Sequence, residues 1–297
     1  MPSSSPISTP DETVTDRQRL LSEWDELLIR RGPLRESLGL YREILALWAG
    51  WHGGAERRSD REETWCHAQW ERGAPLLAEG EPPVSRSSLD PLVWGALDLL
   101  RGIREEDAAG LARLAEAWDT GAVAPSAFLP ARAHESQQRL GLSSDLFGFF
   151  GQIVLRPPLE EVALPFRDLI GAAGWDRGIC PICGLPAAFS DVGDDGKRRL
   201  VCHLCGSEWG FARIRCASCD NRDPNTLKIL SAEEEEGYFI EACGMCRGYL
   251  KGLDRRLRWN VVSSLLEDWG SPHLDLIALD RGYWRGVPTL LLLARES

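Results

Sequence analysis

The chain has 297 residues, 43% of them hydrophobic, and a formal net charge of −11. A chain of this length and composition can form two domains, or one domain with a smaller attached unit. No apolar run approaches the length of about 18 residues that a membrane span needs, and the N-terminal residues lack the basic and apolar regions of a secretory signal. We therefore expect a cytoplasmic protein without membrane insertion.

The first half of the chain is predicted to be helical. Residues 1–15, "MPSSSPISTPDETVT", are rich in Ser, Thr and Pro and are predicted to be a disordered lead. From 16 to 173, apolar residues recur at intervals of three and four, as in "DRQRLLSEWDELLIRRG", which predicts an α-helical domain. Residues 71–90 are predicted to form a loop because Gly, Pro and Ser are frequent there. The predicted helices are 16–32, 33–51, 91–103, 107–119, 135–152 and 158–173.

From residue 174 the pattern changes to short strands, turns and cysteines. "LPAAFSDV" and "KRRLVCHL", joined by "GDDG", predict a first β-hairpin within residues 174–212. "LKIL" and "GYFIEAC" predict a second within 213–257, with the "SAEEEE" run as a solvated hairpin tip. Residues 258–297 are predicted to be a short helical C-terminal segment. The expected fold class is α+β: a helical domain, two tandem β-hairpin modules and a helical C-terminus.

Four Cys-x-x-Cys pairs lie in the two hairpin modules. Two such turns let four thiolates surround one metal ion as a tetrahedron, with metal–sulfur distances of roughly 2.3 Å. A module this short needs the metal, because tetrathiolate binding contributes on the order of 10 to 16 kcal/mol of folding free energy. An interleaved pairing, first pair with third and second with fourth, is the alternative. Pairing sequential turns predicts site 1 at Cys180, Cys183, Cys202 and Cys205, and site 2 at Cys216, Cys219, Cys243 and Cys246.

The residue after each pair distinguishes the two sites. Gly184 and Gly206 follow the pairs of site 1, where a residue free to adopt positive φ relieves the tight turn. Asp220 and Arg247 take these places in site 2, which makes its geometry less certain. The ligand set does not separate zinc from a mononuclear iron, since both accept four thiolates.

Other motifs indicate no catalytic role. We find no Ser/His/Asp arrangement, P-loop or GxGxxG, so the protein is expected not to be an enzyme and to have no catalytic residues. A thioredoxin-like site requires a βαβ unit, and a zinc deaminase requires a His-x-Glu motif. The sequence shows neither pattern around its Cys-x-x-Cys pairs. Cys66 and His67 are interpreted as structural, His203 as exposed within its turn, and Trp209 as packed against the module.

The charge distribution argues against nucleic-acid binding. Residues 176–258 contain 13 Lys and Arg against 13 Asp and Glu, so the cysteine-rich part is neutral. A nucleic-acid reader carries a basic face that neutralises phosphates. A zinc-ribbon nucleic-acid binder is therefore retained only as the weakest alternative.

The order of these pieces resembles the formate dehydrogenase accessory protein FdhE family. The resemblance rests on "WDRGICPICG", "LVCHLCGSEWGFARIRCASC" and "YFIEACGMCRGYLKGLD", and it is most specific over residues 175–254. It implies a chaperone-like maturation factor that binds the catalytic subunit of a respiratory formate dehydrogenase before export and is required for its activity. It also implies rubredoxin-like iron at the eight cysteines, with zinc as the alternative. The competing hypothesis is an iron electron carrier in cofactor maturation. Homodimerisation is left open.

Overall fold

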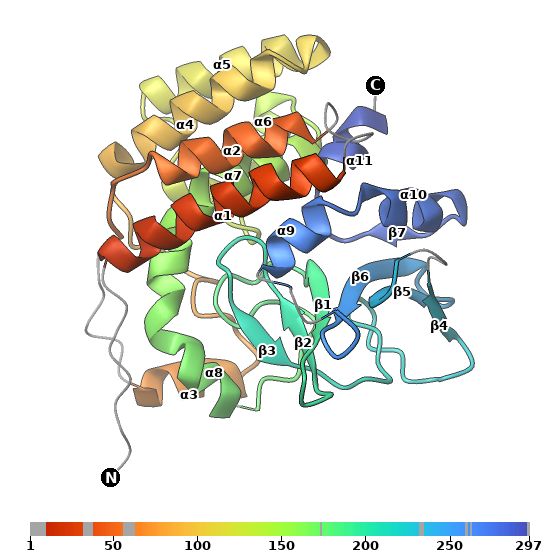
Figure 1. The fold of residues 1–297 in the computed structure, drawn as a ribbon. Coiled ribbons are helices and arrows are strands. Elements are labelled where there is room, and N and C mark those ends of the chain that lie inside the picture. The colour runs from red at the N-terminus through yellow and green to blue at the C-terminus, as the bar shows by residue number, and fades with distance from the viewer. Residues whose placement is uncertain are drawn as a thin grey trace.

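The computed structural model describes residues 10–31, 38–55, 63–172, 174–231, 235–258, 261 and 263–295. Most of the helices form a layer over one β-sheet, with α9 (Ser264–Trp269) between the layer and the sheet, and α10 (Pro272–Asp280) covers the sheet beside α9 (Figure 1). The α+β class is confirmed. Helix α1 begins at Pro10, inside the segment predicted to be a disordered lead, whose first nine residues lie outside the described ranges. The proposed domain boundaries remain predictions.

The helices of the first half follow the predicted periodicity with three differences. A further helix, α3, is present where none was predicted, and α4 begins inside the loop predicted at 71–90. Helix α7 also spans the break that was predicted between the helices 135–152 and 158–173. Short 3-10 helices occur at Glu105–Asp107, Pro125–Phe128 and Leu164–Phe166. The α-helices are α1 (Pro10–Arg30), α2 (Gly39–Ala49), α3 (Glu63–Glu71), α4 (Arg86–Arg101), α5 (Ala108–Asp119), α6 (Ala133–Leu140), α7 (Ser144–Ala163), α8 (Arg167–Ala172) and α11 (Leu290–Arg295).

Helix α7 continues through two prolines where the sequence predicted a break. Pro157 has no N–H, so the carbonyl of Ile153 loses its normal partner four residues later. The indole N–H of Trp48, from α2, donates to that carbonyl at 2.8 Å. The tertiary contact replaces the missing helical hydrogen bond, and the buried helix therefore does not end at the proline.

The strands of both modules form one continuous sheet. Its order is β3-β2-β1-β6-β5-β4, with β7 beside β6. Strands β1 and β6 pair in parallel, with Phe189 opposite Lys251, and this pairing joins the first module to the second. The sequence predicted two separate hairpins, and strand β6 was not predicted. The strands are β1 (Phe189–Val192), β2 (Arg198–Val201), β3 (Glu208–Gly210), β4 (Leu227–Leu230), β5 (Tyr238–Cys243), β6 (Gly248–Asp254) and β7 (Trp284–Arg285).

The buried apolar residues form two clusters. The larger unites the helical layer with the first module: it contains Trp24 and Phe150 together with Cys180 and Trp209. The smaller lies between the sheet and α10, around Ile240 and Leu274. The first module is therefore part of the main core, whereas the second is packed mainly against the C-terminal helices.

Within the described ranges, none of the helices is both long enough and apolar enough to cross a membrane.

Candidate metal centres

Each Cys-x-x-Cys pair folds into the same tight turn, called a knuckle below. The N–H of the residue after the second cysteine donates to the carbonyl of the first, at 3.0 Å for Gly184 and for Gly206, 3.1 Å for Asp220 and 2.9 Å for Arg247. A backbone N–H also points at the first sulfur of each pair, as from Ile182 to Cys180 at 3.4 Å. Such N–H donors stabilise a thiolate.

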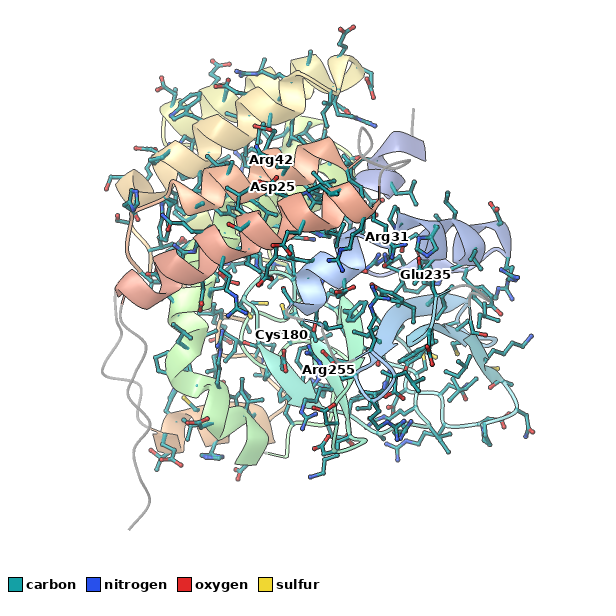
Figure 2. The ribbon with its side chains drawn as sticks, in the orientation of Figure 1. Asp25, Arg31, Arg42, Cys180, Glu235 and Arg255 are labelled. Carbon is teal, nitrogen blue, oxygen red and sulfur yellow. The ribbon has the colours of Figure 1, made fainter. Side chains whose placement is uncertain are left out.

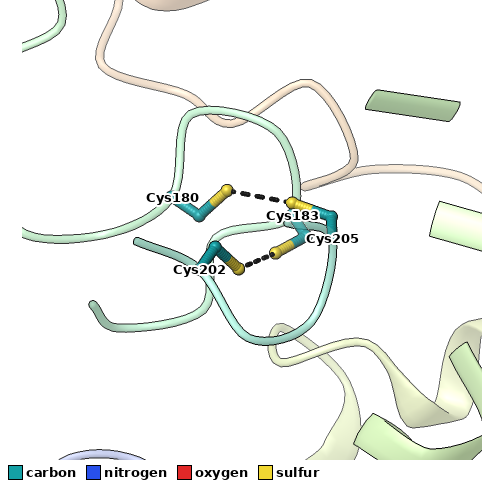
Figure 3. A group of neighbouring side chains, drawn as sticks. All are labelled: Cys180, Cys183, Cys202 and Cys205. Atoms are coloured by element: carbon teal, nitrogen blue, oxygen red, sulfur yellow. Dashed lines mark hydrogen bonds between the residues drawn. The ribbon is translucent and has the colours of Figure 1, made fainter. Parts of the chain in front are cut away.

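The first metal centre, called centre 1, brings together Cys180, Cys183, Cys202 and Cys205. The Sγ atoms of Cys180 and Cys205 are 3.4 Å apart, as are those of Cys183 and Cys202. Figure 3 shows the four side chains converging from two facing knuckles. The thiols are grouped by sequential knuckles, not in the interleaved arrangement.

The second metal centre, called centre 2, brings together Cys216, Cys219, Cys243 and Cys246. The Sγ atoms of Cys216 and Cys246 are 3.7 Å apart and those of Cys219 and Cys243 are 3.8 Å apart. A tetrahedron with metal–sulfur distances of about 2.3 Å has edges of about 3.8 Å. Both groups therefore have the size of a tetrathiolate site, and centre 1 is slightly contracted.

The burial of centre 1 makes a cation necessary for four thiolates to coexist. All four of its cysteines are buried. Burial raises the pKa of the Cys180 and Cys183 thiols well above their usual range. Burial also opposes ionisation of Cys205, but hydrogen bonds with the neighbouring thiols and Ser207 hold the pKa of Cys205 well below its usual range. Cys180 and Cys183 keep their protons unless a divalent cation replaces them. The donor set fits a soft divalent metal and does not choose between zinc and iron.

Centre 2 is more open. Cys219 is exposed, Cys216 and Cys246 are half-buried, and Cys243 is buried. Burial opposes ionisation of Cys243, but the N–H groups of Cys246 and Met245 and the side chain of Asn221 hold its pKa at about 7. The Asn221 amide lies 3.6 Å from the Cys243 sulfur. Solvent therefore reaches sulfur atoms of centre 2 but not those of centre 1.

The helical layer holds both knuckles of centre 1. The indole N–H of Trp70 and the N–H of Leu76 both donate to the carbonyl of Pro181, at 3.0 Å each, and Leu77 donates to Ile182 at 2.8 Å. The guanidinium of Arg156, on α7, donates to the carbonyl of His203 at 2.6 Å and to Glu160 at 2.6 Å. The segment between α3 and α4, which is the non-helical part of the loop predicted at 71–90, therefore supports the first knuckle.

The positions that follow the knuckles adopt the left-handed conformation in both centres. The φ angles are 81° and 68° at Gly184 and Gly206, and 64° and 61° at Asp220 and Arg247. A non-glycine residue pays a steric penalty there. Asp220 pairs with Arg215 and Arg222. Arg247 contacts the C-terminal segment: its guanidinium lies 4.1 Å from the Tyr283 ring. The sequence predicted the special turn, and the structure shows which contacts offset its strain.

His203 is buried, so the prediction that it is exposed is wrong. It lies between Cys202 and Cys205 with 3% of its surface exposed, and its Nδ1 is 3.5 Å from Asp268. Burial lowers the pKa of His203 to about 3, which keeps the ring neutral. The sequence did not show that α9, which carries Asp268, folds back over the knuckle.

Behind His203 lies a buried ion cluster, defined here as Lys251, Asp268, Asp275 and Arg285. Lys251 donates to Asp275 at 2.6 Å, and Arg285 donates to Asp275 at 2.7 Å and to Asp268 at 2.6 Å. Burial alone raises the pKa of Asp268, but the Arg285 and Lys251 cations hold it at about 2. Two cations thus balance two buried carboxylates, as buried charges require. This cluster was not predicted from the sequence, because its members are scattered over β6, β7, α9 and α10.

The remaining predicted residues have structural positions. Cys66 is fully buried in the main core, and His67 is partly exposed beside it on α3. Trp209 is buried and its indole N–H donates to the carbonyl of Arg177 at 2.8 Å. Residues 232–234 of the glutamate run lie outside the described ranges, but Glu235 pairs with Arg31 at the end of α1 (Figure 2). That part of the run is therefore a tertiary contact and not only a solvated tip.

Comparison with known proteins gives similarities in sequence and in fold. No family model matches the chain. It is 38% identical over 122 residues to a "Protein FdhE homolog" of Stutzerimonas stutzeri, covering 39% of each chain. It is 30% identical over 149 residues to one of Aquifex aeolicus, covering 48% of this chain and 51% of the relative. The matches thus span from about two fifths to one half of these curated relatives.

The fold comparison covers far more of the molecule. The crystal structure of the FdhE protein from Pseudomonas aeruginosa superposes with a TM-score of 0.61 at 26% sequence identity. The match covers 96% of this chain and 97% of that chain. It therefore includes the helical layer as well as both metal-binding modules.

Proposed function

We propose that this chain, which belongs to the FdhE family, is an accessory protein for the assembly of a formate dehydrogenase. The observation that carries the proposal is the fold likeness over 96% of the chain, because it extends to the helical part, where sequence motifs are loose. The sequence matches support the same conclusion over a shorter span, 39% to 48% of the chain.

In its finer form, the proposal is that the protein binds the catalytic subunit of a respiratory formate dehydrogenase before export. It would act in the cytoplasm as a chaperone-like factor, not as an enzyme. The net charge of −11 suits a basic segment on the partner. A neutral cysteine-rich region gives no support to a nucleic-acid role.

The two centres would each hold one metal ion. The proposed ligands are the eight cysteines grouped above, whose sulfur distances fit a tetrathiolate. The family resemblance favours rubredoxin-like iron, and zinc remains the alternative. Bound metal would stabilise the fold of the two hairpin modules, whose residues position the neighbouring surfaces.

Anaerobic co-purification tests the proposal directly. The tagged chain is used to capture the unexported catalytic subunit, and an unrelated exported oxidoreductase serves as the negative control. We expect the catalytic subunit to be retained and the control protein to be lost. Absence of the subunit from the eluate, with both proteins folded and metal-loaded, would contradict the proposed role.

A second candidate function is single-electron transfer at centre 2. It is favoured by the exposure of Cys219, because an electron carrier needs its metal close to the surface. Iron with thiolate ligands has a usable reduction potential, whereas zinc does not. Metal analysis and optical spectra of protein purified without air distinguish the two: stoichiometric zinc without reducible iron excludes electron transfer.

A further inference from the structure

The fourth knuckle and the C-terminal segment are in direct contact. We propose that metal at centre 2 holds the C-terminal segment, residues 264–285, in its docked position, so that metal binding and docking are thermodynamically linked. The proposal requires that centre 2 binds a metal, but it is independent of the formate dehydrogenase role.

The fourth knuckle and the C-terminal segment are joined by hydrogen bonds in both directions. The N–H of Trp284 donates to the carbonyl of Arg247 at 2.8 Å, and its indole N–H donates to the carbonyl of Cys246 at 2.6 Å. In return, the guanidinium of Arg247 donates to the carbonyls of Arg281 and Gly282. Strand β7 pairs with β6, with Trp284 opposite Gly248. The knuckle and the segment therefore hold one another through backbone groups of both.

The fold of the fourth knuckle depends on the metal at centre 2. The carbonyls of Cys246 and Arg247 are in place only while the turn is folded, and in a short module the metal supplies that folding free energy. Arg247 has a φ of 61°, which is unfavourable for a residue with a Cβ. Without metal, the strained turn opens and the acceptors for Trp284 move apart.

The C-terminal segment also reaches the buried ion cluster. Arg285 comes directly after Trp284 and donates to Asp268 on α9 and to the carbonyl of Ala188 at 3.0 Å. Asp268 in turn faces His203 in the second knuckle of centre 1. Loss of the Trp284 contacts therefore loosens the anchor of the buried ion cluster, and the segment connects the two metal centres.

The third knuckle provides a matched control. Asp220 has the same position after its cysteine pair and a similar φ of 64°. Its ion pairs are to Arg215 and Arg222, and its own module supplies both partners. Asp220→Gly and Arg247→Gly thus make the same backbone change at the same metal centre, but only the second also removes contacts to the C-terminal segment.

The first experiment empties centre 2 selectively. Full-length Cys219→Ser is loaded with Zn²⁺, its metal content is measured, and hydrogen exchange is followed by mass spectrometry. We expect half the zinc of the native protein and exchange in residues 264–285 faster by about 10-fold or more. Unchanged exchange in this segment, with centre 2 shown to be empty, would overturn the proposal.

The second experiment tests the reverse direction. Because linkage is reciprocal, weakening the docked segment must weaken metal binding at centre 2 by the same factor. Zinc affinity, measured by equilibrium competition with a chromophoric chelator, should be about 10-fold lower in Arg247→Gly than in Asp220→Gly. Equal affinities in the two variants would refute the linkage.

A milder variant covers the case in which Arg247→Gly does not fold. Trp284→Phe keeps an aromatic side chain in β7 but removes the indole N–H that donates to the carbonyl of Cys246. We expect a lower zinc affinity and faster exchange of residues 264–285, as in Arg247→Gly, but with a smaller change in each. Native behaviour of Trp284→Phe in both measurements would count against the proposal.

Discussion

The two metal centres are made from the same local turn but have different surroundings. Centre 1 is buried in the main core. Trp70, Leu77 and Arg156, from the helical part of the chain, donate hydrogen bonds to backbone carbonyls of its two knuckles. Centre 2 has an exposed cysteine and is supported by its own module and by the C-terminal segment. The difference teaches that an identical ligand set does not fix the strength or the accessibility of a site, which depend on the elements packed around it.

The largest expected effect is the loss of a ligand from centre 1. Cys180→Ser should abolish soluble, cooperatively folding protein, because the contribution of a tetrathiolate, on the order of 10 kcal/mol, is comparable to the whole stability of a domain. Cys219→Ser, its counterpart in the open centre, should leave the main core folded and loosen only its own module and the C-terminal segment. Soluble yield and thermal unfolding by circular dichroism measure both. Comparable losses in the two variants would show that burial does not distinguish the centres.

Metal release should follow the same order. With excess chelator, we expect centre 2 to lose metal faster than centre 1 by about 10-fold or more, since the chelator can reach Cys219 but not the buried sulfurs. Two kinetic phases of equal amplitude should appear in native protein, and only the slow one in Cys219→Ser. A single phase in native protein would contradict the predicted difference.

The support that the helical layer gives to centre 1 can be removed separately. Arg156→Met takes away buried hydrogen bonds to the carbonyl of His203 and to Glu160, and should cost about 2 kcal/mol in the free energy of unfolding. The slow phase of metal release should become faster while the fast phase is unchanged.

Arg199→Met is the matched control for Arg156→Met. Arg199 lies in the same module, but its ion pair with Asp195 is on the surface. Its loss should change the free energy of unfolding by less than about 1 kcal/mol. Denaturant unfolding compares the two variants, and equal destabilisation would remove the special role of Arg156.

The smallest effect is expected at the third knuckle. Asp220→Gly relieves an unfavourable positive φ but removes ion pairs that are exposed to solvent. The two changes oppose each other, so the net change in the free energy of unfolding should be within about 1 kcal/mol. A thermal shift measurement suffices. A large destabilisation would mean that the Asp220 pairs, and not the metal, hold the turn.

The sequence predicted the parts of the site that are local. Cys-x-x-Cys spacing, the hairpin between pairs and the special position after each pair are short-range features, and the thiols converge as sequential pairing requires. The sequence did not predict strand β6, because Gly248 and Gly252 weaken its strand signal and Lys251 interrupts its apolar face. Gly252 is needed there, since a Cβ would lie 2.4 Å from the Phe239 ring. Lys251 is tolerated because distant carboxylates neutralise it.

The unpredicted features share one physical cause, which is that their partners are far away in the chain. The continuation of α7 through Pro157 depends on Trp48, and the burial of His203 depends on a helix more than 60 residues later. The different burial of the two centres likewise arises from packing against the helical layer. Only the presence of Asp220 and Arg247 in place of glycine indicated from the sequence that the centres differ.

The parallel pairing of β1 with β6 has a consequence for biosynthesis. Strand β1 is translated about 60 residues before the strand that completes its hydrogen bonding, with Phe189 opposite Lys251. While the ribosome makes the second module, one edge of β1 has no strand beside it. A ribosome that stalls or terminates between these positions releases a chain with an open strand edge, which invites aggregation. Synthesis through residue 254 at an uninterrupted rate is therefore what protects the newly made sheet.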